Sequence, residues 1–548
     1  MYMSLRNRVV LSIFAAVSLA FLVACGSSSN HGTPPPTGAF SNSNLNGTYV
    51  FSTLGTDPNT GATMTMAGAF TACGCSGGTI STGTFDYYDP SIGIQQGNTI
   101  SSGSYNVGGD GRGTITLANT STFGTVQLDF VLNSTSGGLV SEYNTNVGSG
   151  SGTLVQQASS SVTPGSNYAY SVSGENLAGS VPLAYAQVGA FTLGSGGLLI
   201  NTAYDLTEEN LESGAVTVIP NSSFTAGSSL AVGTGTTPGT ASFTDPSNGN
   251  VYTFDVFAIS ANDLKLFETD GNFSAVGDAF PQATSLPSGT LAFTMNGVDS
   301  SISPLSMGGL LTFSGTSISS GIEDFNDAGS PNTDSSVAGG FTNSGTIVDG
   351  RAGLQLTSFY NGSSGLNGTY TFAAYPTSNG TLLLEIDGNG ITAGNALVQT
   401  NTSFASAQGY GVDISALNIG TGSLYEEDDI AEFTSTSTGF SGLVDVNDEG
   451  TTTGNSPPLF DGTYSSLSAG RYQFTANPSG NFNGVSGAVY TVDGSTLLFL
   501  EGDTFQVGTG ILQVQNASGS DAQAAAQRVP VFRGLLAASK HAAKRKQK

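Results

Sequence analysis

Histidine and tryptophan are nearly missing from this 548-residue sequence, and their scarcity restricts its chemistry. There is no tryptophan, and the two histidines are His31 and His541, near the two ends of the chain. Residues 41–527 can therefore form neither a Ser-His-Asp triad nor a histidine-ligated metal centre. The missing tryptophan removes the side chain that stacks best on sugar rings. From this inventory we expect a protein that is not an enzyme.

Charged residues are also scarce, at 9% of the chain, and they are unevenly placed. All 39 Asp and Glu residues lie between residues 41 and 527, where the only cations are Arg112, Lys265, Arg351 and Arg471. Such an acidic surface repels nucleic acid, so we expect no nucleic-acid partner. It favours solubility and attracts divalent cations.

Glycine is abundant, with 77 residues, and hydrophobic residues alternate with polar ones along many short segments. One segment places Val126, Leu128 and Phe130 on one side of an extended chain, with Gln127 and Asp129 on the other. A period of two predicts β-strands with one buried face, and frequent Gly, Asn and Asp residues predict tight turns. The composition therefore favours an all-β fold.

The N-terminal segment has the features of an export signal in the correct order. Two cations, Arg6 and Arg8, precede an apolar run over residues 9–23, which is too short for a membrane-spanning helix. The run ends in Leu-Val-Ala-Cys-Gly, in which the small residue Ala24 precedes Cys25. This segment resembles the signal peptide and lipobox of bacterial lipoproteins.

The resemblance implies that residues 1–24 are removed and that the Cys25 thiol is acylated, which attaches the protein to a membrane. A residue other than Asp after the cysteine, here Gly26, implies the outer membrane in that family. The alternative is an ordinary secretory signal with an accidental cysteine. Residues 25–40 have the Ser, Gly and Pro content of a lipid-anchored linker.

An aspartate in a predicted turn recurs every 119 to 121 residues, which indicates four similar units. The aligned residues are Asp86, Asp205, Asp324 and Asp445. The units cover residues 41–160, 161–285, 286–403 and 404–519, and a basic, Ala-rich tail covers residues 520–548. We expect this tail either to be solvated or to form a short helix that docks on anionic lipid or on the acidic body.

The first unit contains seven or eight predicted strands joined by short turns, the pattern of an antiparallel meander. Such a meander hides its edges by closing into a small up-and-down barrel or by folding into a sandwich, and we favour the barrel. We therefore predict four tandem antiparallel β-meander domains. The strand order is similar to avidin-like and lipocalin-like barrels, and the chain resembles tandem β-repeat lipoproteins of the bacterial surface.

A glutamate recurs near the end of each unit, and three units carry an arginine 30 to 34 residues before it. Scarce cations beside recurring anions predict ion pairs within units. The predicted pairs are Arg112 with Glu142, Arg351 with Glu385, and Arg471 with Glu501. They are either structural bridges that close one end of each barrel or polar anchors for a ligand inside it.

Two of the recurring aspartates begin segments that resemble the start of an EF-hand calcium loop. The candidate calcium ligands are Asp324, Asn326, Asp327, Asp445, Asn447 and Glu449. The closing glutamate of an EF-hand is absent, since Ser456 occupies its place after Asp445. The alternative is that these side chains only cap hairpin turns, which leaves the protein without a cofactor.

Two further local clusters have a structural and a functional interpretation. Cys73 and Cys75 are predicted to form a disulfide outside the cytoplasm, because two thiolates without nearby histidines make an incomplete zinc site. The acidic run 426–429 is predicted to be a solvated loop, with calcium binding as the alternative.

These observations favour a non-enzymatic lipoprotein of the cell envelope that presents repeated β-domains for structural or adhesive contacts with an unidentified partner. Repeated weak contacts gain from avidity without any catalytic centre. The first alternative is a module that binds a small ligand or calcium in each repeat. The second is a glycosidase that uses carboxylates alone, since that chemistry needs only two acids.

Overall fold

The structure is a computed structural model. It describes residues 40–119, 124–144, 148–246, 249–342, 350–359, 368–420, 424–453, 457–518, 535, 540 and 541. The predicted signal peptide and Cys25 lie outside the described residues. The fold is all-β, as the alternation of the sequence predicts, and it contains four antiparallel sheets in tandem.

The first sheet is a closed eight-stranded barrel in which each strand pairs with the next and the last pairs with the first. A short 3-10 helix, Asn42–Asn44 (η1), precedes it. The strands are Asn46–Thr56 (β1), Thr63–Cys73 (β2), Thr79–Asp89 (β3), Gly93–Val107 (β4), Arg112–Asn119 (β5), Thr125–Ser134 (β6), Gly137–Glu142 (β7) and Ser149–Gln156 (β8).

The second sheet has nine strands and remains open, with β12 at one edge and β13 at the other. A 3-10 turn, Ser195–Gly197 (η2), precedes its third strand. The strands are Asn167–Asn176 (β9), Leu183–Leu193 (β10), Leu199–Asn210 (β11), Val216–Ser222 (β12), Ser229–Ala231 (β13), Gly239–Thr244 (β14), Val251–Ser260 (β15), Asp263–Glu268 (β16) and Phe273–Pro281 (β17).

The third sheet is again a closed barrel of eight strands. These are Gly289–Asp299 (β18), Pro304–Ser314 (β19), Ser317–Asp327 (β20), Ser330–Phe341 (β21), Ala352–Phe359 (β22), Thr369–Thr377 (β23), Gly380–Glu385 (β24) and Gly390–Val398 (β25).

The fourth sheet has nine strands and closes through an additional pairing between β27 and β28. Its strands are Gly409–Asn418 (β26), Tyr425–Ser435 (β27), Gly439–Asp448 (β28), Thr451–Thr452 (β29), Gly462–Ser468 (β30), Arg471–Ala476 (β31), Val485–Thr491 (β32), Thr496–Glu501 (β33) and Gln506–Val514 (β34). Three of the four predicted barrels are therefore confirmed as closed, and the second sheet is an open version of the same meander, which we also call the second barrel.

Alternation along each strand fills the inside of each sheet with apolar side chains. Leu128 and Phe130 of β6 are fully buried in the core of the first barrel, together with Phe51 of β1. Tyr252 and Phe254 of β15 occupy the core of the second sheet. Burial of this kind stabilises each unit by roughly 25 cal/mol per Å² of apolar surface.

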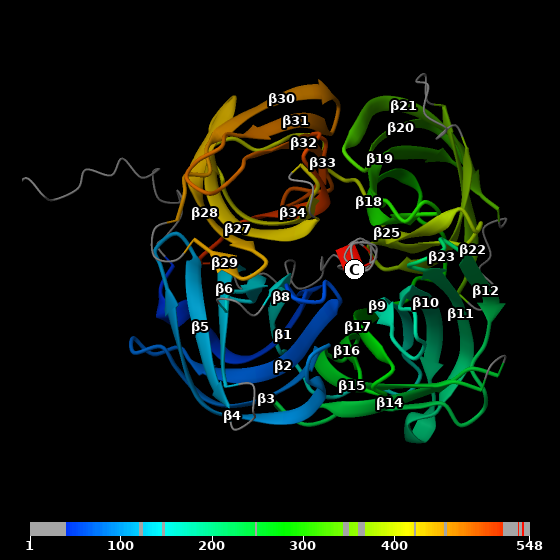
Figure 1. Cartoon of the computed structure of the whole chain (residues 1–548), viewed down its shortest axis with the longest axis horizontal. Coiled ribbons are helices and arrows are strands. Elements are labelled where there is room, and N and C mark those ends of the chain that lie inside the picture. Colours follow the sequence, from blue (N-terminus) through cyan, green and yellow to red (C-terminus); the bar gives the residue numbers. More distant parts are fainter. Residues whose placement is uncertain are drawn as a thin grey trace, which may run out of the picture. The chain divides into compact units, whose positions relative to one another are not determined.

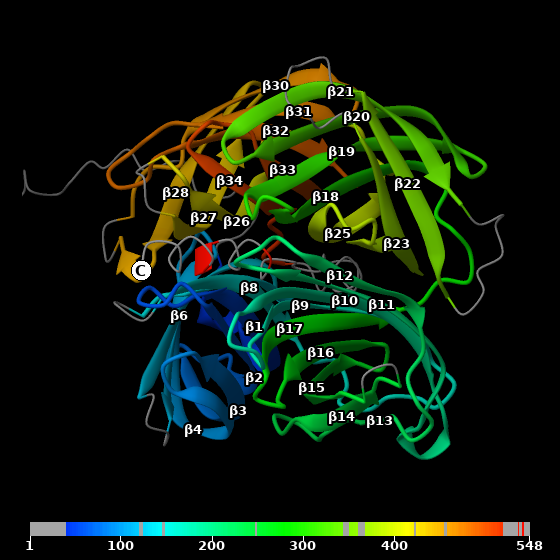
Figure 2. The same ribbon diagram turned by 45° about the vertical axis from the view of Figure 1, so that its right-hand side comes forward.

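The outer surfaces of the barrels are also partly apolar, because each barrel packs against two others (Figures 1 and 2). At the contact between the first and second barrels, Val50 and Leu54 of β1 pack with Phe257 and Phe267. Separate clusters join the second barrel to the third, the third to the fourth, and the fourth back to the first. The strands at these contacts are therefore buried on both faces, which is why their burial is nearly continuous.

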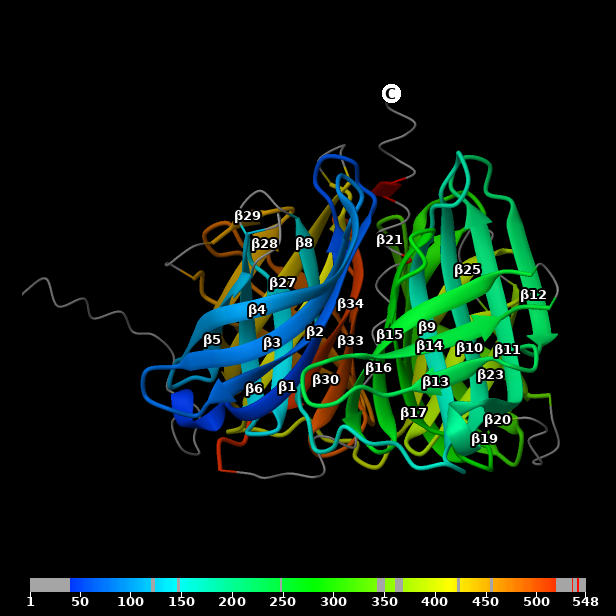
Figure 3. The ribbon, with the colours of Figure 1, turned by 90° about the horizontal axis from the view of Figure 1, so that it is seen from below.

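Three residues of the basic tail are described, and they lie among the barrels. Leu535 is fully buried in the cluster between the second and third barrels. The Lys540 ammonium donates a hydrogen bond to Thr56 Oγ1 (2.8 Å), and it also pairs with Glu449. Figures 1 and 3 show the described end of the chain, drawn in red, near the place where the four barrels meet. Within the described residues, no helix is long and apolar enough to cross a membrane.

Candidate functional site

The four recurring aspartates lie within strands, so the prediction that they sit in turns is wrong. Each is on the third strand of its unit, and at three of them the register with the following strand shifts. There the Oδ1 atom of the aspartate accepts a backbone N–H of that strand, in a β-bulge. The pairs are Asp86 with Gly97 (2.6 Å), Asp205 with Asn221 (2.9 Å) and Asp324 with Asp334 (2.9 Å).

The three arginines pair with recurring aspartates of a neighbouring barrel, and not with the glutamates of their own unit. Arg351 Nε lies 2.7 Å from Asp205 Oδ2, and its Nη2 donates to Asp205 Oδ1 at 2.8 Å. Arg471 makes the same two-bonded contact with Asp324, at 2.6 and 2.7 Å. The predicted pairs of Arg351 with Glu385 and of Arg471 with Glu501 are therefore incorrect.

The first unit follows the same rule. Arg112 Nη1 lies 2.9 Å from Asp445 Oδ2 of the fourth barrel, and Arg112 Nη2 lies 3.1 Å from Asp110 Oδ2. The predicted pair of Arg112 with Glu142 is therefore also wrong. Since the guanidinium is planar and the contacts are charge-assisted, these bonds fix the orientation of one barrel against the next.

All three contacts follow the same order around the four barrels: each arginine binds the aspartate of the preceding barrel, and the fourth barrel precedes the first. The third barrel contacts the second, the fourth contacts the third, and the first contacts the fourth. Tyrosines opposite two of the arginines complete the sites: Tyr375 donates to Asp205 Oδ2 (2.7 Å) and Tyr490 donates to Asp324 Oδ2 (2.5 Å). The second unit has no such arginine, and its cation, Lys265, pairs with Asp278 on the adjacent strand at 2.5 Å.

The residue two positions after each of three aspartates makes a second contact between barrels. Thr207 Oγ1 donates to the backbone carbonyl of Glu385 (2.8 Å). Asn447 Nδ2 donates to the carbonyl of Glu142 (2.6 Å), and Asn326 Nδ2 donates to that of Glu501 (3.3 Å). The recurring aspartates and glutamates thus belong to the same interfaces, but the glutamates contribute their backbone.

The side chains of the recurring glutamates point into the barrels. Glu142 lies on β7, opposite the core residue Leu128, and its side chain is 1% exposed. Burial raises the pKa of Glu142 to about 8, with a further contribution from Asp89. Burial likewise raises the pKa of Glu385 to about 8. These carboxyls hold their protons to higher pH than usual because the charged form loses its hydration.

The structure does not bring the six candidate calcium ligands together. Asp324 and Asp445 bind arginines. Asn326 Oδ1 accepts the N–H of Gly329, and Asn447 Oδ1 accepts that of Gly450.

Of the remaining two candidates, Glu449 pairs with Lys540, whereas the pKa of Asp327 is raised by burial and by Asp299. Among the described residues, no group of three or more His, Cys, Asp and Glu side chains has the arrangement of a metal site.

Two other sequence predictions have separate outcomes. Cys73 and Cys75 are joined by a disulfide at the end of β2, with an S–S distance of 1.98 Å. The acidic run 426–429 is not a solvated loop, because it lies in β27 and each of its side chains is at most 2% exposed. Asp428 accepts a hydrogen bond from Ser151 of the first barrel (2.6 Å), so the run forms part of an interface.

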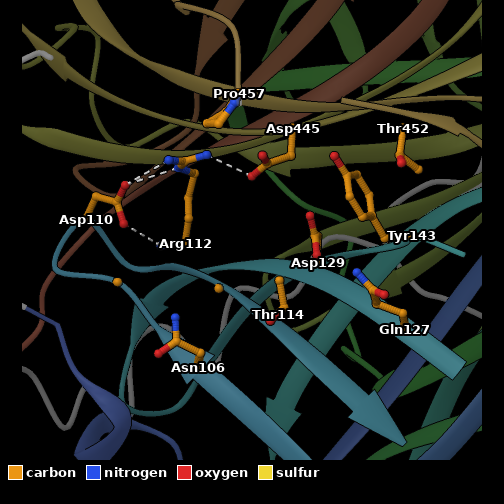
Figure 4. A pocket seen from close by; sticks show the side chains of 12 residues that line it. Asn106, Asp110, Arg112, Thr114, Gln127, Asp129, Tyr143, Asp445, Thr452 and Pro457 are labelled. Atoms are coloured by element: carbon orange, nitrogen blue, oxygen red, sulfur yellow. Dashed lines mark hydrogen bonds and ion pairs between the residues drawn. The ribbon is translucent and has the colours of Figure 1, made fainter. Parts of the chain in front are cut away.

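A polar cleft of about 480 Å³ lies beside one bridge, between the first and fourth barrels (Figure 4). Its lining comprises Asn106, Gly108, Asp110, Arg112, Gly113, Thr114, Gln127, Asp129 and Tyr143 of the first barrel and Asp445, Thr452 and Pro457 of the fourth. Asp129 is 4% exposed, and its Oδ1 atom has no hydrogen-bond partner within the described residues. Burial raises the pKa of Asp129 well above its usual range, with a contribution from Asp445.

The sequence matches no protein-family model and no curated protein, so the arrangement of its own residues has to carry the functional argument. Sequence reasoning missed Tyr375, Tyr490 and the cleft residue Asp129 as functional positions. Tyr375 and Tyr490 occur at the same place in their repeats, each on the strand that pairs with the strand beginning at or just after the arginine. Aligning the repeats strand by strand would have found this pair. Asp129 carries no such signal, since its setting depends on a neighbouring barrel.

Proposed function

We propose that this protein is a non-enzymatic lipoprotein of the bacterial cell envelope, which presents four joined β-barrels for structural or adhesive contacts. The observation that supports this proposal most strongly is the use of the recurring polar residues. Asp205, Asp324 and Asp445 bind arginines of adjacent barrels, so the residues that repetition selects hold the repeats together. Recurring residues that hold the repeats together are expected in a scaffold, because its function depends on a fixed arrangement of its domains.

The membrane attachment is proposed from the lipobox alone. Acylation of Cys25 would anchor the chain in the outer membrane. The linker over residues 25–40 would let the barrels move a short distance from that anchor. More than half of the 39 carboxylates are buried within the described residues, so the surface is less acidic than the sequence alone suggests. The net negative charge of the chain still favours solubility and disfavours binding of nucleic acid.

The absence of enzyme activity is likewise part of the proposal. His541 is the single histidine within the described residues, and its Nδ1 lies 3.0 Å from Glu175 Oε2 at a contact with the second barrel. A general acid or base should lie within hydrogen-bond reach of a substrate in an accessible pocket. This histidine is instead 9% exposed and bound to a carboxylate.

Fractionation of cells that express the full chain tests the anchoring. We expect the native protein to incorporate labelled palmitate and to separate with the outer membrane, and the Cys25→Ser variant to lose both properties. A native protein that is soluble and unlabelled would contradict the proposal. For the contacts, we expect beads coated with the four-barrel body to adhere to envelope material in proportion to surface density, and equal adhesion of uncoated beads would contradict it.

Calcium binding in each repeat is the alternative, and it would make the barrels a cation-stiffened adhesin. Its support is the high density of carboxylates, including Glu427 and Asp448, which interact inside the fourth barrel. Calorimetric titration with calcium separates the two proposals, because only the calcium alternative predicts saturable heat.

A further inference from the structure

We propose that the cleft between the first and fourth barrels binds a neutral, hydroxyl-rich ligand such as a stretch of glycan. The cleft lies within the usual range of small-ligand pockets, roughly 300–1,000 Å³. This inference concerns a site between repeats, and it does not depend on where the protein is located.

The polar groups of the cleft are available for a ligand. Within the described part of the chain, the side chains of Asn106, Thr114 and Gln127 make no hydrogen bond to the protein. Figure 4 shows them spread along one side of the space, with Asn106 and Gln127 well apart. Two amides and a hydroxyl supply both donors and acceptors, which is the combination that a sugar hydroxyl can use.

Asp129 gives the strongest single indication of a ligand. It lines the cleft between Arg112 and Tyr143 in Figure 4, it is almost fully buried, and its Oδ1 atom has no partner within the described residues. A buried polar atom without a hydrogen bond destabilises the fold, because its lost hydration is not replaced. A ligand hydroxyl that reached this carboxyl would remove that destabilisation.

The charges of the cleft favour a neutral ligand. An anion would meet three carboxyl groups, those of Asp110, Asp129 and Asp445. A cation would compete with Arg112, which already binds Asp110 and Asp445 at 3.1 and 2.9 Å. With the ionic contacts made internally, what remains for a ligand is hydrogen bonding to neutral groups.

The apolar part of the lining is small and suits a sugar ring. In Figure 4, Pro457 lies above the Arg112 guanidinium, and Tyr143 lies on the other side of Asp445. The Tyr143 hydroxyl is bonded to Thr453 Oγ1 (2.5 Å), which fixes the ring in place. Tyr143 is 5% exposed, so only part of its ring and the proline ring can contact the C–H surface of a sugar, while the polar side chains bind its hydroxyls.

The test compares three probes with the same ring but different charge on the full chain, by saturation-transfer NMR and calorimetry. The probes are glucose as the neutral sugar, glucosamine as the cation and glucuronate as the anion, and cellobiose extends the neutral probe. We expect saturable binding of glucose at millimolar concentrations, tighter binding of cellobiose, and weaker binding of both charged sugars. Preference for a charged sugar, or no neutral binding at any concentration reached, would overturn the proposal.

Variants locate the binding site. The double variant Thr114→Ala and Gln127→Ala should weaken cellobiose binding about tenfold, since each lost hydrogen bond costs roughly 0.5–1.5 kcal/mol. Gln355→Ala is the matched control, because Gln355 is an exposed glutamine on β22 of the third barrel. Equal affinity in the double variant and the native chain would place the sugar elsewhere and overturn the proposal. Because Thr114 and Gln355 are exposed and Gln127 is half-buried without a side-chain hydrogen bond to the described residues, unfolding curves should coincide for all three proteins.

Discussion

Asp86 of the first barrel interacts with Asp255 of the second barrel. This interface therefore has two aspartates at the place where each of the other three interfaces has an aspartate and an arginine. The second unit has Thr240 at the position of the arginine, and Asp255 pairs with Thr240 as Tyr490 pairs with Arg471. Burial and the Asp255 carboxylate raise the pKa of Asp86 to about 8, and burial raises the pKa of Asp255. Two facing carboxyls share a proton, since both cannot ionise at close range.

This interface should weaken as the pH rises. Because the pKa of Asp86 is raised to about 8 in the folded protein, against about 3.9 when unfolded, the stabilisation that its proton provides is complete below about pH 4 and is lost as the pH rises through 8. In the Asp255→Asn variant the amide replaces the proton-sharing partner, and the free energy of unfolding should depend less on pH between 5 and 9. Denaturant unfolding across that range measures it, and an unchanged slope would contradict the assignment.

A double substitution should convert this interface into the type found at the others. Thr240→Arg with Asp255→Tyr supplies the guanidinium and hydroxyl that contact Asp205 and Asp324 elsewhere. We expect the double variant to be more stable than the native chain at pH 8, where the native carboxyl pair loses its proton. Thr240→Lys with Asp255→Tyr is the control, because an ammonium cannot make the planar two-bonded contact. Lower stability of the arginine variant at pH 8 would show that the interfaces are not equivalent.

The buried glutamates should destabilise the barrels at alkaline pH. Glu142 has a pKa raised to about 8 by burial, so its ionisation above that pH places a charge in the core of the first barrel. Glu142→Gln keeps the size of the side chain and removes the charge. We expect it to unfold at higher denaturant concentration than the native chain at pH 9 and at a similar concentration at pH 5. Glu212→Gln, at an exposed glutamate, is the matched control for charge removal. Equal curves for the native and Glu142→Gln proteins at both pH values would contradict this reading.

The tail should contribute to stability through Lys540. Its side chain is fully buried and contacts Thr56 of the first barrel and Glu449 of the fourth. Lys540→Met retains the aliphatic stem but removes the ammonium, and we expect a loss of about 1.5–3 kcal/mol, as for other charged hydrogen bonds. Lys540→Arg is the conservative control. If the melting temperature of Lys540→Met equals that of the native chain, the tail does not hold these barrels together.

Calcium should not bind at the candidate loop residues. The side chains of Asp324 and Asp445 already bind arginines, and those of Asn326 and Asn447 bind backbone groups. Calorimetric titration of the purified protein should therefore show no saturable heat, and the metal should leave the melting temperature unchanged. Binding of several equivalents with a raised melting temperature would restore the calcium alternative.

Much of the fold could be predicted from the sequence, because its determinants are local. The alternation of Val126, Leu128 and Phe130 with polar residues is enough to predict a strand, and the spacing of Asp86, Asp205 and later aspartates is enough to predict four units. Closure into barrels follows from the need to hide strand edges. The opening of the second sheet at β12 and β13 has no comparable signal.

The candidate site was predicted less well, because its contacts join different repeats. The sequence predicts a pair between Arg351 and Glu385, the recurring glutamate of its own unit, whereas its partner Asp205 lies 146 residues away in the chain. The same reasoning failed for the Asp-Val-Asn-Asp sequence of residues 445–448, whose polar residues suggest a turn. In the structure Asp445 and Asn447 alternate along β28 and face the first barrel. Polar residues that are buried between domains resemble exposed ones in a single sequence.

The central claim is that paired arginines and aspartates hold the barrels together, and a double-mutant cycle on Arg471 and Asp324 tests it most directly. Arg471 is 2% exposed and makes two bonds to Asp324 as well as one to Asp334. Replacing Arg471 therefore leaves the buried Asp324 carboxylate without its cation, at a cost of roughly 3–5 kcal/mol. The cycle uses Arg471→Met, Asp324→Asn and the double variant, with unfolding followed by denaturant. We predict that the double variant is much less destabilised than the sum of the single variants, with a coupling of about 1–3 kcal/mol. Additive effects would contradict the account, because they would show that the third and fourth barrels are held together without this bridge.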